Sequence, residues 1–162
     1  MPSPINKSLH HPLELKIIPV IQVAIAAIIM FIIAQLFSVS EGLLAVKWFI
    51  SGIFIILGLL FGIGGIVSFR MANTTVNPTK PNNATSLVQS GIFKITRNPM
   101  YLGLVCLLIA WSAWLGSVYS LAIIVAFILY MSRFQILPEE RALIELFGDE
   151  YIEYCLKVKR WL

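Results

Sequence analysis

Three long stretches of this chain carry no charged side chain, and they constrain its fold more than any other feature. They cover residues 17–37, 48–69 and 98–132. At a rise of about 1.5 Å per residue, a helix of about 20 residues crosses a hydrocarbon core about 30 Å thick. The chain is 59% hydrophobic and 12% charged, so a water-soluble fold would expose large apolar patches. The sequence therefore predicts an all-α integral membrane protein.

The third uncharged stretch is too long for one span and predicts a helical hairpin that turns near residues 114–117. We therefore expect about four transmembrane helices, over residues 17–37, 48–69, 99–115 and 118–137, in one domain of residues 1–162. A polar loop is expected over residues 70–97, and two amphipathic helices over residues 138–162, beginning at Pro138. Gly58 and Gly62 have the GxxxG spacing that allows a second helix to approach closely.

The distribution of basic residues predicts the orientation in the membrane. With four spans, both termini and the polar loop lie on the same side, and eleven of the twelve Lys and Arg residues fall there. Only Lys47 falls on the other side. Because cytosolic segments carry the excess of Lys and Arg, we expect the termini, the loop and any site beside them to be cytosolic. The net charge of +4 collects at this membrane face, so it does not indicate a nucleic-acid partner.

Polar residues capable of chemistry gather at the same face. Asn98 and Pro99 are typical of a helix start, as N-cap and first-turn residue. The free N–H groups of such a start, together with Arg97, suit an anion such as a carboxylate. Glu139 and Glu140 follow Pro138, where they can hold a cationic ligand. By pattern alone, a snorkelling arginine and two glutamates that cap a helix explain the same residues.

No metal site and no glycosylation site is expected. His10 and His11 are adjacent on the polar N-terminal segment, where such pairs are usually solvated. Asn73 and Asn83 match the glycosylation sequon, but both belong to the loop predicted to be cytosolic.

Four motifs, in order, resemble a known family. They are Leu87 to Phe93, Arg97 to Gly103, Glu139-Glu140, and Phe147 to Tyr154. Together they resemble the isoprenylcysteine carboxyl methyltransferase family, which belongs with the membrane phospholipid methyltransferases. The resemblance covers the C-terminal half and implies an S-adenosylmethionine-dependent methyltransferase with a membrane-embedded helical fold and no Rossmann domain.

The resemblance also implies a site. Arg97, Tyr101 and Glu139 would be the catalytic residues. The cofactor pocket would be lined from the loop, from the helix start and from the C-terminal side by Thr85, Ser86, Leu87, Val88, Phe93, Asn98, Pro99, Met100, Tyr101, Glu139 and Glu140. These residues suit the cofactor physically: its adenine is flat and apolar, its ammonium matches a carboxylate, and its carboxylate matches free N–H groups.

The position that faces the acceptor departs from the family pattern. Carboxyl-methylating members place an arginine one helical turn before the first glutamate, and here that residue is Gln135. Arg133 lies about 200° away around a helix of 3.6 residues per turn. We expect Arg133 and Gln135 to face a lipophilic small-molecule acceptor that enters from the bilayer, with a carboxylate, an amine or a thiol as nucleophile. The alternative is a non-catalytic four-helix membrane protein for lipid binding or assembly. The oligomeric state stays open.

Overall fold

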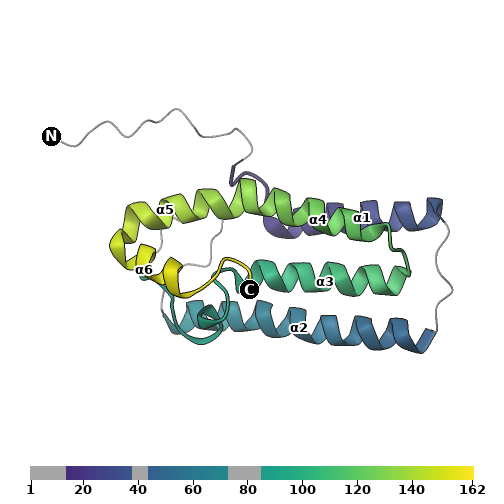
Figure 1. Cartoon of the computed structure of the whole chain (residues 1–162), viewed down its shortest axis with the longest axis horizontal. Coiled ribbons are helices and arrows are strands. Elements are labelled where there is room, and N and C mark those ends of the chain that lie inside the picture. Colours follow the sequence, from purple (N-terminus) through teal and green to yellow (C-terminus); the bar gives the residue numbers. More distant parts are fainter. Residues whose placement is uncertain (1–13, 38–43, 73–84) are drawn as a thin grey trace.

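The computed structural model describes residues 14–37, 44–72 and 85–162 (Figure 1). Its elements are α1 (Pro19–Leu36), α2 (Leu44–Met71), the 3-10 turn η3 (Gly91–Lys94), α3 (Pro99–Leu115), α4 (Ser120–Met131), the π-helical segment η4 (Ser132–Ile136), α5 (Leu137–Phe147) and α6 (Asp149–Lys157). No strand occurs in these three ranges, so the predicted all-α class without a Rossmann domain is confirmed for them. The histidine pair, both sequons, residues 38–43 and much of the predicted loop lie outside the described residues.

Three helices are long and apolar enough to cross a membrane, and they cover Pro19–Leu36, Leu44–Met71 and Ser120–Phe147. α3 is also apolar but slightly shorter, with 17 residues. Figure 1 shows α3 running between α2 on one side and the pair of α1 and α4 on the other. Large apolar side chains are exposed along α1, α2 and α4, as expected of helices whose solvent is hydrocarbon. The chain is therefore an integral membrane protein.

The close packing predicted at the α2 glycines is found against α3. A Cβ atom added at Gly103 would lie 2.8 Å from the carbonyl oxygen of Gly58 and 3.0 Å from the nitrogen of Gly62. Only hydrogen fits there. One end of this contact is reinforced by Ser51, whose hydroxyl donates to the carbonyl oxygen of Ala110 at 3.0 Å. The small residues thus fix α3, which begins at the candidate site, against α2.

The helix break expected at Pro138 is absent. α4, η4 and α5 form one continuous helix, and the N–H of Leu137 donates to the carbonyl of Ser132, five residues earlier. Pro138 has no N–H, so the Phe134 carbonyl lacks its ordinary donor four residues later. The N–H of Leu15 donates to that carbonyl at 3.1 Å instead. Because the N-terminal segment supplies this hydrogen bond, the helix passes through the proline and carries Glu139 directly on from the membrane span.

Candidate active site

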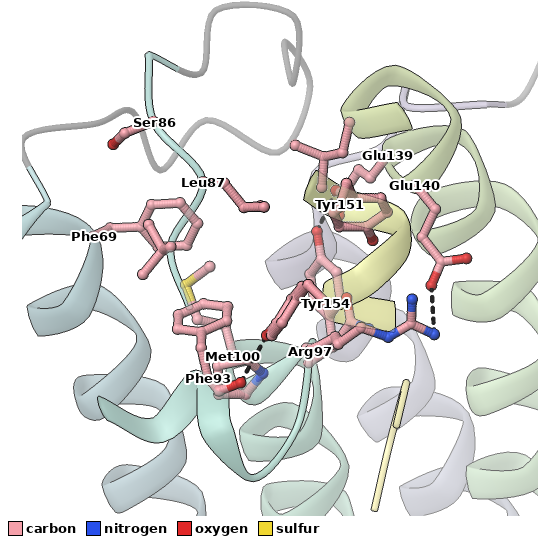
Figure 2. Close-up of a pocket in the computed structure, with 15 residues that line it drawn as sticks. Phe69, Ser86, Leu87, Phe93, Arg97, Met100, Glu139, Glu140, Tyr151 and Tyr154 are labelled. Carbon is pink, nitrogen blue, oxygen red and sulfur yellow. Dashed lines mark hydrogen bonds and ion pairs between the residues drawn. The ribbon is translucent and has the colours of Figure 1, made fainter. Parts of the chain in front are cut away.

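A pocket opens where the loop over residues 85–97, the start of α3, α5 and α6 come together (Figure 2). The cavity has a volume of about 100 Å³, and the recess measures about 650 Å³ when the space open to solvent is included. Sites for drug-sized ligands span about 300–1,000 Å³, so a ligand of nucleoside size has to occupy the mouth as well. The lining residues are Phe69, Ser86, Leu87, Val88, Phe93, Arg97, Asn98, Pro99, Met100, Tyr101, Glu139, Glu140, Leu143, Tyr151 and Tyr154.

The loop that forms one wall is fastened to helices on both sides. The hydroxyl of Ser86 donates to the carbonyl of Ala72 at 3.0 Å, at the end of α2. The ring of Phe93 packs edge-on against Phe69 of α2, with centroids 5.3 Å apart. From α6, the hydroxyl of Tyr154 donates to the carbonyl oxygen of Phe93 at 2.7 Å. The loop is therefore a wall held by α2 and α6 together.

The two sides of the pocket differ in chemistry. Figure 2 shows Phe69, Phe93 and Met100 on one side, and Arg97 and the two glutamates on the other. The first side offers flat and apolar surfaces, and the second offers charge. A ligand that carries both an aromatic system and ionic groups matches this division.

Glu139 is hydrogen-bonded by neutral groups. The hydroxyl of Tyr101 and the Nε2 amide of Gln135, the latter at 2.6 Å, both donate to Oε1 of Glu139. Tyr101 is 5% exposed and Gln135 is fully buried. Within the described ranges, Oε2 receives no hydrogen bond, and no Lys, Arg or His forms an ion pair with the carboxylate. A carboxylate in such surroundings is stabilised by a ligand that brings positive charge.

Glu140 has the opposite surroundings. Arg160 donates from Nε to one oxygen at 3.0 Å and from Nη2 to the other at 2.6 Å. Arg97 lies against the same carboxylate at 3.4 Å, also drawn in Figure 2. The hydrogen bonds to Glu140 raise the pKa of Arg160 above its ordinary value, so this guanidinium stays charged. Arg97 also donates to the sulfur of Cys155, whereas its buried Nε has no hydrogen-bond partner in the described part of the chain.

Residues 158–162 form what we call the C-terminal strap, which crosses the start of α3. The carbonyl of Arg160 accepts from the hydroxyl of Thr96 at 3.1 Å and from the side-chain amide of Asn98 at 3.0 Å. The carbonyl of Lys159 accepts from the N–H of Arg97 at 3.0 Å. Asn98 was predicted to cap α3 with its side chain. It occupies the cap position, but its side chain makes no capping hydrogen bond, and its amide nitrogen donates to the strap.

The structure brings most of the predicted site residues together. All the residues predicted to bind the cofactor line the pocket except Thr85, and Arg97 lines it as well. Arg133 is absent from the lining: it pairs with Glu14 at 2.9 Å and lies over the ring of Phe134. Gln135 also lies outside it, bonded to Glu139. In the described ranges, no group of three or more His, Cys, Asp or Glu side chains is placed to hold a metal ion.

Four lining residues were not among those predicted, namely Phe69, Leu143, Tyr151 and Tyr154. The two tyrosines belong to the fourth family motif, and their spacing of three places them on one face of α6. Both are buried, whereas Ile152 and Glu153 between them are exposed. Burial raises the pKa of both phenols, so they act as neutral groups. The spacing of the two tyrosines on a short polar helix was the signal available in the sequence.

Comparison with known proteins agrees with this geometry. Residues 46–150, more than half of the chain, match the phospholipid methyltransferase family, and the match includes the loop, α3 and both glutamates. An uncharacterized protein of Haemophilus influenzae is 48% identical over 63 residues, which are 39% of this chain and the whole of that protein. The resemblance drawn from the four motifs is therefore confirmed, and this chain belongs to the phospholipid methyltransferase family of membrane proteins.

Proposed function

We propose that this protein is an S-adenosylmethionine-dependent methyltransferase that methylates a small or lipid-like acceptor at the membrane interface. The observation that supports it best is the two-sided pocket at the end of the helical bundle. Aromatic and apolar side chains form one side; the other side carries Arg97 and the carboxylate of Glu139, which has no basic partner in the described ranges. Membership of a methyltransferase family makes this cofactor the natural ligand.

The lining residues fit the cofactor group by group. The adenine would lie against the apolar side chains of Phe69, Phe93 and Met100. Glu139 would hold the cationic part of the cofactor, and Arg97, whose Nε is buried without a partner in the described part of the chain, would hold its α-carboxylate. The backbone N–H groups of Met100 and Tyr101, in the first turn of α3, have no partner within the helix and could add donors for the same carboxylate.

When bound, the cofactor supplies an electrophilic methyl group. The chain itself binds and orients it and excludes water, and no side chain is required to form a covalent intermediate. The neutral donors Tyr101 and Gln135 hold the carboxyl group of Glu139 in place, so it is preorganised toward the cation. Alignment of donor and acceptor in a water-poor site then provides much of the acceleration.

We further propose that the acceptor is lipophilic and reaches the pocket from the bilayer, and that the pocket opens toward the cytosol. The membrane helices and the family support a lipid-like acceptor. The nucleophile is a carboxylate, an amine or a thiol, and the test below separates the three. The excess of Lys and Arg at the pocket end of the helices supports the cytosolic orientation.

The test has two parts, binding and transfer. Calorimetry on the protein purified in detergent should show saturable binding of S-adenosylmethionine. A transfer assay with methyl-labelled cofactor should then label one class among carboxylate, amine and thiol lipids. Glu139→Ala combined with Tyr101→Ala should abolish binding. Glu153→Gln, which removes a carboxylate from an exposed ion pair with Lys157, should leave it unchanged.

Two results would contradict the proposal. One is the absence of cofactor binding by the folded wild-type protein. The other is retained affinity in the double variant. Binding of lipid by a protein that binds no cofactor would support the alternative, a non-catalytic membrane protein for lipid binding or assembly.

A further inference from the structure

We propose that the two adjacent glutamates have different roles: Glu139 is the cofactor ligand, and Glu140 is a positioning residue that acts through Arg160 and the C-terminal strap. This inference rests on the proposed function and goes further, because the family resemblance assigns both carboxylates to the cofactor. It also assigns a role to Arg160, which lies beyond the segment that matches the family.

The two carboxylates accept hydrogen bonds from different kinds of donor. Both oxygens of Glu140 accept from Arg160, at 3.0 and 2.6 Å, and Arg97 adds a third positive contact at 3.4 Å. A ligand cation at Glu140 would have to displace or face two guanidinium groups. Glu139 receives both of its hydrogen bonds on Oε1 from neutral donors, which leaves Oε2 for a cation. Glu140 is therefore neutralised by two arginines of the protein, whereas Glu139 has no basic partner in the described ranges.

The ion pair between Glu140 and Arg160 holds the C-terminal strap in place. The side chain of Arg160 is fixed on α5, and its carbonyl accepts from Thr96 and Asn98. The neighbouring carbonyl of Lys159 accepts from the N–H of Arg97. The strap therefore links the helix that carries Glu139 to the backbone that carries Arg97.

The far end of the strap is anchored too, since the indole N–H of Trp161 donates to the hydroxyl of Ser132 at 3.3 Å. With both ends held, the strap sets the separation between Arg97 and Glu139. These are the two residues proposed to bind the carboxylate and the cation of the cofactor. Glu140 and Arg160 thus position the ligands without touching the cofactor.

The experiment compares single and double variants for cofactor affinity, KM and kcat. Glu139→Gln should weaken cofactor binding about a hundredfold or more, because the ligand cation loses its charged partner. Glu140→Gln and Arg160→Gln should each raise the KM for the cofactor about tenfold, with kcat at saturation nearly unchanged. The Glu140→Gln/Arg160→Gln double variant should be no worse than either single variant, since both remove one link. Arg160→Lys, which retains the charge, should recover part of the affinity.

Two controls remove charges from the exposed pair on α6: Glu153→Gln and Lys157→Gln should behave as wild type. Thermal melting establishes that each variant is folded. Hydrogen exchange supplies a readout of the strap that does not depend on the cofactor. The amide of Arg97, which donates to Lys159, should exchange faster in Glu140→Gln and in Arg160→Gln, and at the wild-type rate in Glu139→Gln.

Three outcomes would overturn the inference: equal losses in Glu139→Gln and Glu140→Gln with no effect of Arg160→Gln, full affinity in Glu140→Gln, or unchanged exchange at Arg97. Failure of the proposed function looks different, because the wild-type protein would then bind no cofactor. The exchange measurement would still report whether Glu140 and Arg160 hold the strap.

Discussion

The phenolic hydroxyl of Tyr101, in the first turn of α3, donates a hydrogen bond to Oε1 of Glu139 in α5. The two residues are 38 positions apart, and the contact joins two of the elements that form the pocket. Oε1 of Glu139 accepts this hydrogen bond, and Oε2 has no hydrogen-bond partner in the described ranges. The geometry suits a carboxylate that is held in place by the protein and used by a ligand.

Tyr101→Phe should test this contact with little change in shape. The ring remains, but the carboxylate loses one of its two donors, and hydrogen bonds to charged groups contribute about 1.5–3 kcal/mol. We expect the affinity for S-adenosylmethionine to fall by about tenfold or more. Tyr119→Phe removes a hydroxyl from an exposed tyrosine at the other end of the bundle and should have no effect. If Tyr101→Phe bound the cofactor with wild-type affinity, the hydroxyl of Tyr101 would have no role in binding.

Arg97 should recognise the carboxylate of the cofactor, and a ligand that lacks this group tests it. Wild type should bind the decarboxylated analogue about a hundredfold more weakly than S-adenosylmethionine, because the analogue lacks the carboxylate that Arg97 would bind. In Arg97→Gln the two ligands should bind almost equally. The four affinities, measured by calorimetry, form a thermodynamic cycle that isolates this one interaction. An unchanged ratio in the variant would place the carboxylate elsewhere.

Gln135→Arg should place a guanidinium beside Glu139. Gln135 is fully buried and already bonded to that carboxylate at 2.6 Å, so an arginine there would compete with the cofactor cation. We expect cofactor affinity to fall by about tenfold or more. Gln89→Arg is the control, because Gln89 contacts Glu150 at an exposed position. Increased activity on a carboxylate acceptor, with cofactor affinity retained, would instead support the prediction that Gln135 faces the acceptor.

Gly103→Ala should destabilise the α2–α3 contact. The added methyl group would meet the carbonyl oxygen of Gly58 at 2.8 Å, and backbone atoms cannot move aside as a side chain can. Overpacking costs typically about 1–3 kcal/mol, and each kcal/mol lowers Tm by roughly 2–4 °C in a protein of this size. Gly52→Ala, where nothing lies within 4 Å, is the matched control and should melt at the wild-type temperature. Equal melting of both variants would contradict the close contact.

The proposed orientation predicts which cysteine variants react from each side of the membrane. In a chain with both native cysteines replaced, Lys157→Cys should be labelled by an impermeant maleimide in inside-out vesicles only. Lys47→Cys should be labelled in right-side-out vesicles only, because it is the basic residue assigned to the opposite face. The reverse labelling pattern would contradict the proposed orientation and would show that the pocket faces away from the cytosol.

Much of the fold was predictable because the bilayer allows few solutions. An uncharged stretch long enough to span hydrocarbon has to satisfy its own backbone, and for single segments only a helix does so. The start of the third helix at Pro99 and its end at Leu115 followed from Asn98-Pro99 and from the turn at Gly116. Pro138 was misleading, because the hydrogen bond that lets the helix continue is donated by Leu15, which lies far away in the sequence.

The sequence by itself determined a membrane-embedded helical protein of this family, together with most residues of its pocket, since these depend on local composition and on motifs. Only the tertiary structure decided which of the two adjacent glutamates has an oxygen left for a ligand. The partners that distinguish them are Tyr101, 38 positions before Glu139, and Arg160, 20 positions after Glu140. Neighbouring residues on a helix point in directions about 100° apart, so each meets different elements of the fold, and those elements set its charge balance.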